Sequence, residues 1–591
     1  MCGVVGFIGD REAAPILLNA LRKLEYRGYD SAGLATVDNS SILLKKDIGK
    51  LAEVEQKYHL NELPGKVGIG HVRWATHGNV TPANAHPHLD CKHEIAIVHN
   101  GIIENYRELR HCLEPRHKFI SDTDTEVISH LIEEHMKDCA SLEEAVFRMS
   151  KELDGSYALI AISAREPQKI VATRKDSPLV IGTGEEGNFI ASDTLSFLEE
   201  TNQAIFVECG ETVILTKDKV SLFDSEHREI NREPTDIDWK WDQATKQGYD
   251  FFMMKEILEQ PQAIRRALMQ DKYLIMEMAL DILRARQVVL TGCGTSRYAA
   301  LIGRYVFSKL GGKFSDVVMA SEFHYFSDSV DKDTTVITIS QSGETADVIH
   351  GVKKARENGA TIFSLVNVLG SSLARMSDKV LYLNCGPEIG VPATKSFISQ
   401  LVIFYLLAFA MANKLDEGIE KIRAVSSAVE GIFRDNGKKL TELAHRLKEK
   451  SDFYYIARGI NFAIAGEGAL KLKEVAYVHA EGMPAGELKH GTLALIEEGT
   501  PVIAICPRDY TFHETLSNIA ETKARGALSI GVSDQREEVF FDEWIKIPAV
   551  EEVFYPLVSV VPLQLLAYHL AVAKGLDPDK PRNLAKSVTV K

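Results

Sequence analysis

The sequence predicts an α/β protein with several separately folded parts, and three observations support this. The chain has 591 residues, of which 45% are hydrophobic, enough for several domains that each bury a core. Residues 1 to about 222 mix short β-type runs such as "EIAIVHNGII" with amphipathic helical patterns such as Pro15 to Leu24, which predicts α/β or α+β structure rich in sheet. Further along the chain, apolar strands alternate with helices in an internal repeat.

The repeat has an offset of about 165 residues. "RQVVLTGCGTS", which begins at Arg286, is echoed by "DFYYIARGINF", which begins at Asp452, and "TVITISQSGET" is echoed by "PVIAICPRDYT". Each copy has an apolar strand, a turn and a helix in succession, which is typical of a parallel, doubly wound sheet. The sequence therefore predicts two copies of one α/β unit.

The segment 224–248 is polar, charged and aperiodic, and predicts a connection between domains. The predicted order is a first domain over residues 1–223, the linker over 224–248, a first repeat domain with preceding helices over 249–440, and a second repeat domain with a C-terminal tail over 441–591. The longest apolar stretches, 397–412 and 553–573, are interrupted by residues such as Gln400 and Pro562. We expect buried helices there, and no membrane span.

The charge and the cysteines narrow the possible functions. The net charge is −15 and no Lys/Arg block is present, so extended contact with nucleic acid or an anionic membrane is not expected. The eight cysteines are scattered, without a CxxC pair or a Cys/His cluster at zinc spacing, which predicts reduced thiols in a cytoplasmic protein and no zinc site. The N-terminus lacks the charged and apolar regions of a secretory signal.

A phosphate site is predicted in the first repeat copy. Hydroxyls, a glycine and the N–H groups of a helix start follow one strand, and a second helix start follows another. The residues are Ser340, Gln341, Ser342 and Thr345 in the first place, and Thr295 and Ser296 in the second. An ordinary turn with a capping box is the alternative for "SQSGET". The second copy has "CPRDYT" there, so we expect only the first copy to bind phosphate.

Cys2 has two interpretations. A free cysteine is often a small buried residue, but here it stands directly behind Met1 in "MCGVVGFIG". If Met1 is removed, the α-amine of Cys2 lies close enough to serve as its base, and Cys2 becomes a candidate nucleophile. Asn100 and Gly101 are likewise either a tight turn or two donors for an oxyanion.

Motifs in both halves resemble known families. "MCGVVGFIG", "HVRWATHG", "VHNGIIENY" and "SDTDTEVI" resemble the glutaminase domain of class II glutamine amidotransferases, which are N-terminal nucleophile hydrolases. "ISQSGETAD", "EGALKLKEVAYVHAEG", "GELKHG" and "PRNLAKSVTVK" resemble paired sugar-isomerase (SIS) domains. The resemblance implies an αββα sandwich followed by two doubly wound SIS domains with parallel sheets.

The order of the two halves implies an activity. It resembles that of the amidotransferases that use L-glutamine to convert D-fructose 6-phosphate into D-glucosamine 6-phosphate and glutamate, as homodimers without a metal, nucleotide or redox cofactor. In the glutaminase half, Cys2 is by resemblance the nucleophile, and Asn100 and Gly101 form the oxyanion hole. Trp74 also matches the residue that gates the passage for ammonia. The residues implied to bind glutamine are Arg73, Trp74, Thr76, His77, Gly78 and Asp124.

In the isomerase half, Glu474 is by resemblance the base that moves a proton between C1 and C2, with Lys471 as its neighbour. From spacing alone these residues are i, i+3 partners on a helix and fit equally well as a surface ion pair. His490 matches the acid/base for ring opening, which reaches the site of the other subunit, and Lys586 matches a lysine at the sugar carbonyl. The acidic alternation in "SDTDTE" lacks the further ligands of a metal site.

Two other functions fit parts of the sequence. One is an amidotransferase with a different sugar-phosphate acceptor. The other is a non-catalytic protein that senses sugar phosphates, since SIS domains also occur as binding modules, although no basic helix-turn-helix segment is present.

Overall fold

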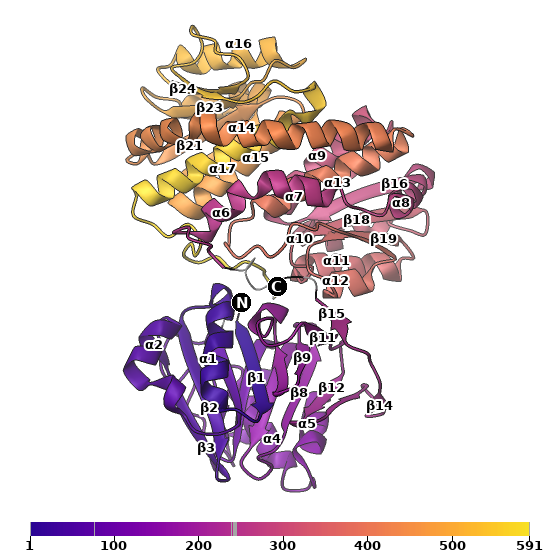
Figure 1. Cartoon of the computed structure of the whole chain (residues 1–591), viewed down its shortest axis with the longest axis vertical. Coiled ribbons are helices and arrows are strands. Elements are labelled where there is room, and N and C mark those ends of the chain that lie inside the picture. The colour runs from indigo at the N-terminus through magenta and orange to yellow at the C-terminus, as the bar shows by residue number, and fades with distance from the viewer. Residues whose placement is uncertain (1, 76, 238, 240–244, 590–591) are drawn as a thin grey trace. The chain divides into compact units, whose positions relative to one another are not determined.

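The computed structural model describes residues 2–75, 77–237, 239 and 245–589. The chain forms two compact units, Met1–Ala244 with Ala585–Lys591, and Thr245–Leu584 (Figure 1).

The first unit contains two antiparallel sheets. The eight-stranded sheet has the order β15-β11-β9-β10-β1-β4-β2-β3, and the seven-stranded sheet has the order β14-β13-β12-β8-β7-β6-β5. The strands of the first sheet are β1 (Gly3–Gly9), β2 (Ser31–Asp38), β3 (Ser41–Ile48), β4 (Val67–Arg73), β9 (Val180–Gly184), β10 (Gly187–Ala191), β11 (Gln203–Phe206) and β15 (Thr235–Asp236). Those of the second are β5 (His88–Leu89), β6 (Ile95–Ile103), β7 (Gly155–Ser163), β8 (Ile170–Lys175), β12 (Thr212–Leu215), β13 (Val220–Phe223) and β14 (Glu229–Ile230).

Side-chain alternation along the strands builds four layers. In β6, Ala96 and Val98 pack with Val4 of β1 in a core between the sheets, while Ile95 and Ile97 pack against helices on the other face. The helices are α1 (Ala13–Leu24) and α2 (Leu51–Tyr58) on the first sheet, and α3 (Tyr106–Leu113), α4 (Glu126–His135) and α5 (Leu142–Ser150) on the side of the second (Figure 1). This is the layering of the predicted αββα sandwich.

The segment predicted as a linker is partly structured. It contains β14, which pairs with β13, and β15, which pairs with β11. Short polar edge strands of two residues carry no periodic apolar signal, so sequence reasoning missed them.

The second unit contains two parallel sheets of five strands, with orders β17-β16-β18-β19-β20 and β22-β21-β23-β24-β25. Numbered along each sheet's own sequence, both orders are 2-1-3-4-5, which confirms the predicted repeat. The strands are β16 (Gln287–Gly292), β17 (Asp316–Met319), β18 (Thr334–Ser340), β19 (Thr361–Val366) and β20 (Lys379–Tyr382), then β21 (Asp452–Ala457), β22 (His479–Pro484), β23 (Pro501–Ile505), β24 (Leu528–Ser533) and β25 (Glu543–Lys546).

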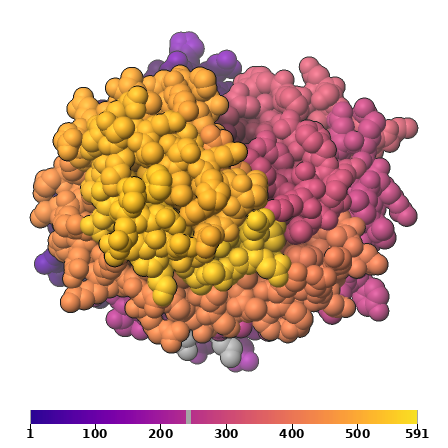
Figure 2. Space-filling view, turned by 90° about the horizontal axis from the view of Figure 1, so that it is seen from above, coloured from indigo at the N-terminus to yellow at the C-terminus, as the bar shows by residue number. Residues whose placement is uncertain are grey.

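The helices join the two copies into one core. Buried residues of both sheets and of the helices between them form a continuous apolar cluster. The helices are α6 (Phe252–Leu258), α7 (Gln260–Ala267), α8 (Lys272–Arg284), α9 (Gly294–Lys309), α10 (Ala320–Phe326), α11 (Ala346–Glu357), α12 (Ser372–Met376), α13 (Lys395–Met411), α14 (Leu415–Leu447), α15 (Asn461–Ala476), α16 (Phe512–Lys523) and α17 (Tyr555–Ala573). Figure 2 shows the copies as adjacent lobes, magenta to pink and orange to yellow.

The two apolar stretches are buried helices, as predicted. Every residue of α13 is buried, and so are nearly all residues of α17. Only Glu552–Ala573 among the described helices is long and apolar enough to cross a membrane, and most of its apolar window is buried inside the protein, against α14 and α15.

Candidate active sites

Cys2 precedes the central strand of the first unit. β1 lies between β10 and β4, which fixes the backbone at Cys2. The Cys2 thiol donates to the carbonyl of Trp74 at 3.3 Å, and its Sγ accepts from the Trp74 N–H at 3.2 Å. Burial raises the pKa of the Cys2 thiol above its ordinary value, so a nearby base has to take the proton before the sulfur attacks.

The predicted oxyanion donors lie beside Cys2. The Asn100 side chain on β6 donates to the Cys2 carbonyl at 2.9 Å, and its Oδ1 is buried without a hydrogen-bond partner among the described residues. Gly101 has φ +133°, and a Cβ there would lie 1.9 Å from the Ser156 carbonyl oxygen. Only glycine fits at this point, because any Cβ would clash with Ser156. The backbone next to Asn100 therefore depends on this glycine.

Charged groups complete this cluster. Arg73 at the end of β4 is buried, and its guanidinium donates to the carbonyls of Asn79 at 3.3 Å and Gly78 at 3.4 Å, and to that of His77. Asp124 is also buried and accepts from the Ile103 N–H at 2.8 Å. The charges of Arg73 and Asp124 both act on the Cys2 thiol, Arg73 lowering and Asp124 raising its pKa after the larger effect of burial.

The structure thus gathers Cys2, Arg73, Trp74, Asn100 and Asp124 at one place. His77 and Gly78 follow in the loop that Arg73 holds, and Gly78 has φ +76°. Thr76 lies outside the described residues. A thiol beside amide donors is an arrangement that suits acyl transfer, and Arg73 and Asp124 suit the two charged ends of an amino acid.

The predicted phosphate turn lies at the switch point of the first parallel sheet. β16 and β18 are neighbours, and the chain leaves their carboxyl ends in opposite directions. After β18, Ser340 Oγ accepts from the Gly343 N–H at 3.0 Å and lies 3.0 Å from Thr345 Oγ1. Thr345 caps α11 without a side-chain capping bond, which disagrees with the simple capping-box alternative. Ser342 Oγ accepts from the Glu344 N–H at 3.2 Å, and Gln341 is half-buried in the same turn.

The corresponding turn of the second copy holds a carboxylate. Asp509 accepts from the Thr511 N–H at 2.8 Å and from its hydroxyl at 2.7 Å, and its other oxygen accepts from Asn461 Nδ2 at 2.8 Å. A carboxylate repels phosphate, which agrees with the prediction that only the first copy binds it.

Helix α15 carries a buried row of charges that meets the first copy. Lys471 Nζ lies 2.5 Å from Glu474 Oε2 and 3.6 Å from Glu467 Oε1, and Thr295 Oγ1 of α9 donates to Glu467 Oε1 at 3.2 Å. The Glu467 and Lys471 side chains are at most 1% exposed, and that of Glu474 is 20% exposed. The pair is therefore not the surface ion pair that spacing alone allows.

Burial shifts the pKa values of two residues of this row, Glu467 and Lys471. It raises the pKa of Glu467 to about 8, and the Glu474 carboxylate adds to the rise. Burial lowers the pKa of Lys471, but the carboxylates of Glu474 and Glu467 outweigh it and raise the pKa above its ordinary value. The row therefore places Glu467 and Lys471, both with raised pKa values, side by side, with the half-buried Glu474 at its more exposed end.

Both halves match known families. Residues 71–199 match the Glutamine amidotransferase domain, and residues 281–410 and 446–574 match the SIS domain. The isomerizing glutamine–fructose-6-phosphate aminotransferases of Thermococcus kodakarensis and Pyrococcus horikoshii are 48% and 47% identical to this chain, over 100% of it and 100% of each relative. The chain belongs to the isomerizing glutamine–fructose-6-phosphate aminotransferases.

Solved structures agree with the second unit. The C-terminal domain of glucosamine-fructose-6-phosphate aminotransferase from Francisella tularensis is 33% identical, with a TM-score of 0.54, and the match covers 57% of this chain and 100% of that one. The tagatose-6-phosphate ketose/aldose isomerase of Escherichia coli shares the fold at 20% identity, with a TM-score of 0.50 over 56% of this chain and 95% of that one.

Two buried polar residues of the isomerase half, Glu467 and Gln400, were not predicted as part of the site. Glu467 stands four residues before Lys471, a spacing that is visible in "EGALKLKE". Gln400 interrupts the apolar helix α13, and its Nε2 donates to Ser296 Oγ at 3.0 Å. A polar residue inside an otherwise apolar helix is the signal that could have found it.

The roles of two residues named from the resemblance are not tested by the structure. His490 ends a short 3-10 helix, Ala485–His490, and is exposed. Lys586 belongs to the terminal segment that groups with the first unit. Their roles at the sugar stay predictions.

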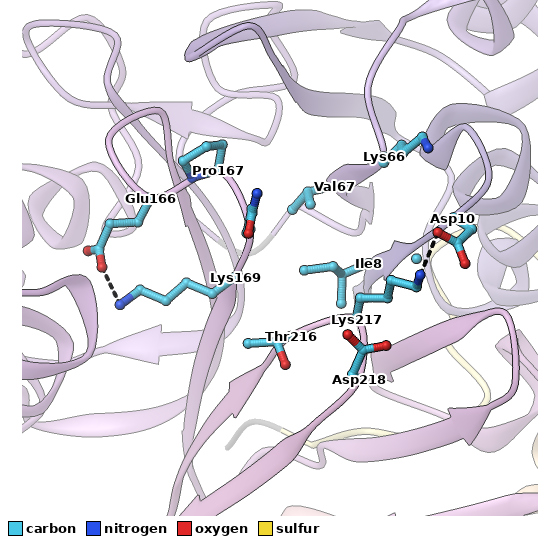
Figure 3. Close-up of a pocket in the computed structure, with 12 residues that line it drawn as sticks. Ile8, Asp10, Lys66, Val67, Glu166, Pro167, Lys169, Thr216, Lys217 and Asp218 are labelled. Carbon is cyan, nitrogen blue, oxygen red and sulfur yellow. Dashed lines mark ion pairs between the residues drawn. The ribbon is translucent and has the colours of Figure 1, made fainter.

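A further pocket in the first unit is unrelated to Cys2. It lies at the other end of β1, lined by Ile8, Gly9, Asp10 and residues of three other segments (Figure 3). Lys217 pairs with Asp10 at 2.7 Å and Lys169 pairs with Glu166, so these lysines are already neutralised by protein carboxylates.

Proposed function

We propose that this chain transfers the amide nitrogen of L-glutamine to D-fructose 6-phosphate and isomerises the product to D-glucosamine 6-phosphate, releasing glutamate. The observation that carries the proposal is the contact of Thr295 with the buried row Glu467–Lys471–Glu474, next to the serine-rich turn of the first SIS copy. A phosphate cradle beside a base is what ketose–aldose isomerisation requires. Hydrolysis of glutamine at Cys2 supplies the ammonia.

In the glutaminase step, Cys2 gives its proton to its own α-amine once Met1 is removed, and Sγ attacks the carboxamide carbon of glutamine. Asn100 and Gly101 stabilise the oxyanion. The tetrahedral intermediate collapses to a thioester and ammonia, and water then releases glutamate. Arg73 binds the substrate carboxylate and Asp124 binds its ammonium group, with Thr76, His77 and Gly78 completing the pocket and Trp74 gating the ammonia passage.

In the isomerase step, Ser340, Gln341, Ser342 and Thr345 hold the phosphate, and Thr295 and Ser296 lie at the phosphate or sugar hydroxyls. His490 assists ring opening, and Lys586 lies at the sugar carbonyl. Ammonia adds to C2 and water leaves. Glu474 then takes a proton from C1 and returns it to C2, which converts the ketose imine into the 2-amino aldose. Lys471 lies 2.5 Å from Glu474 and orients its carboxylate.

We further propose a cytoplasmic homodimer and an enclosed transfer of ammonia. Exposed His490 fits a role in the site of a second subunit. Enclosure keeps ammonia from being protonated in water. The reaction needs no redox cofactor, since nitrogen keeps its oxidation level and the oxidation of C1 is balanced by the reduction of C2.

The test is incubation with glutamine and a set of sugar phosphates, with identification of the amino sugar by mass spectrometry and chromatography. Glucosamine 6-phosphate from fructose 6-phosphate, in a 1:1 ratio to glutamate, is expected. An amino sugar formed only from another acceptor overturns the substrate assignment. Binding of sugar phosphate without any amination, by protein whose intact mass shows that Met1 is absent, favours a sensor.

A further inference from the structure

Four side chains gather in the first unit, outside the Cys2 cluster. Cys91 lies in the turn between β5 and β6, His117 follows α3, and His130 and Glu133 lie on α4. One ligand atom from each lies within 4.8 Å of all the others. Cys91, His117 and the pair on α4 come from three separate segments without zinc spacing, so the sequence predicts no metal here.

The distances within the group fit a tetrahedron. Cys91 Sγ lies 3.6 Å from His117 Nδ1 and 3.7 Å from His130 Nδ1. Glu133 Oε2 lies 3.0 Å from His117 Nδ1 and 3.6 Å from His130 Nδ1. A tetrahedral zinc with Zn–S of about 2.3 Å and Zn–N or Zn–O of about 2.1 Å gives edges of roughly 3.6 Å and 3.4 Å. Three of these distances match such edges, and His117 Nδ1 and Glu133 Oε2 are closer, at hydrogen-bond distance.

Hydrogen bonding alone does not account for His130. Its side chain is 1% exposed, yet Nδ1 is 3.6 Å from Glu133 and Nε2 is 3.7 Å from Glu126. Both separations exceed an ordinary N–H to O hydrogen bond of about 2.9 Å. His130 Nε2 is buried without a hydrogen-bond partner among the described residues. His130 Nδ1 lies 3.6 Å from Glu133 Oε2 and 3.7 Å from Cys91 Sγ, the spacing of ligands around a shared centre.

A second layer of carboxylates stands behind the imidazoles. His117 Nε2 lies 2.5 Å from Glu134 Oε1, and the Nε2 of His130 faces Glu126. In each histidine Nδ1 points to the centre and Nε2 to a carboxylate, which is how metal-binding histidines are commonly oriented. The Lys118 N–H donates to Cys91 Sγ at 3.4 Å.

We propose that Cys91, His117, His130 and Glu133 bind one zinc ion as a structural site. A thiolate, two imidazoles and a carboxylate in a tetrahedron suit Zn²⁺ better than Mg²⁺ or Ca²⁺, which take six or more oxygen ligands. All four positions are filled by protein, so the ion has no open place for a substrate. Cys91 is exposed, which leaves a path for the metal to enter.

The ion ties together the parts that hold the proposed glutamine pocket. It joins the β5–β6 turn and the loop after α3 to α4, and β6 carries Asn100. Glu126 behind His130 accepts from the Ile120 N–H at 2.8 Å and the Ser121 N–H at 2.7 Å, just ahead of Asp124.

Metal analysis of the full-length protein, purified without a histidine tag, tests the proposal. Protein supplied with zinc and then dialysed is expected to hold about one zinc per chain by elemental analysis. Cys91→Ser is expected to lower the zinc affinity by more than about tenfold, and Glu134→Gln, which alters only a carboxylate behind a ligand, by about 10- to 100-fold. Cys112→Ser and His111→Ala change an exposed cysteine and histidine on α3 and should keep the metal.

Cobalt gives a second readout that does not depend on activity. Co²⁺ bound to metal-free protein should show an intense thiolate-to-cobalt band in the near ultraviolet, lost in Cys91→Ser and kept in Cys112→Ser. Because Cys91 is exposed, its conservative replacement is compatible with folding even if His130→Ala is not. Metal-free, folded protein that takes up no zinc or cobalt, or a Cys91→Ser variant that binds them as tightly as the parent, overturns the proposal.

Discussion

Cys2 and the residues around it are held by the backbone of the first unit. The Trp74 N–H and carbonyl both bond to Sγ, and the Asn100 amide bonds to the Cys2 carbonyl. The proposed nucleophile and oxyanion donor are therefore held in place without substrate. Such placement is effective because the donors do not reorganise as charge develops.

Asn100→Ala should lower the glutaminase kcat by about 10²- to 10³-fold, since one oxyanion donor is typically worth about 3–4 kcal/mol. KM for glutamine should change little, because Arg73 and Asp124 remain. Steady-state glutamate release measures both constants. Asn105→Ala, in the turn after β6, is the control, and an equal loss in the two variants would mean that Asn100 acts through folding alone.

Cys2→Ala should abolish glutamine-dependent synthesis and leave the binding of fructose 6-phosphate unchanged, since the proposed phosphate turn lies in the other unit. Product assays with glutamine and calorimetric titration with fructose 6-phosphate check the two halves. Full glutamine-dependent activity in this variant would rule out the Cys2 mechanism.

Glu467 predicts a pH dependence of stability. Its folded pKa of about 8 exceeds its ordinary value of 4.5, so between these pH values the folded state holds a proton that the unfolded state has lost. Stability from this group is full below pH 4.5 and is lost as the pH rises to about 8. Glu467→Gln should remove this fall, measured as the urea midpoint from pH 5 to 8. Glu420→Gln, on the exposed side of α14, is the control, and parallel profiles in parent and Glu467→Gln would refute the assignment.

At the scale of elements, the phosphate turn depends on its glycine. Gly343 has φ +65°, and a Cβ there would lie 2.1 Å from Ser371 Oγ. The turn between β18 and α11 therefore packs against the N-terminus of α12, and this contact shapes the cradle. The same turn in the second copy is shaped by Asp509, so the shared topology holds two turns of different chemistry.

Gly343→Ala should raise KM for fructose 6-phosphate by about tenfold or more, equivalent to about 1.4 kcal/mol, while glutamine hydrolysis is unchanged. Gly312→Ala is a matched control because Gly312 has φ +62° and a Cβ there would meet no atom within 4 Å. Both variants carry the backbone strain, and only the first has the clash. Equal effects on KM would show that strain, and not the shape of the turn, is responsible.

At the scale of the whole molecule, the second unit is one body made from two copies. A continuous core joins the sheets, and Thr295 of one copy bonds to Glu467 of the other. The proposed isomerase site is therefore built by both copies, although only the first has the phosphate turn. Because His490 is exposed, we expect it to act in the isomerase site of a second chain.

Mixing His490→Ala and Glu474→Gln protein after subunit exchange should restore activity to about a quarter of the parent, because half of the dimers are mixed and each holds one intact site. Each variant alone should be inactive in synthesis. Activity assays before and after exchange measure this. If mixing restores nothing while mass analysis shows mixed dimers, His490 acts within its own chain.

Much of this protein follows from local sequence. Periods, turn residues and short motifs are properties of neighbouring residues. They predicted the repeat, the αββα layering by resemblance, and the candidates Cys2, Asn100, Ser340 and Glu474. Tertiary structure alone decided that Lys471 is buried beside the half-buried Glu474, and that Glu467 lies with them. The reason is that burial depends on what packs over a helix. Tertiary structure also decided the strands within residues 224–248, and the meeting of Cys91, His117, His130 and Glu133. Contacts between distant segments are set by strand order and by the packing of helices on sheets, and no local pattern encodes them.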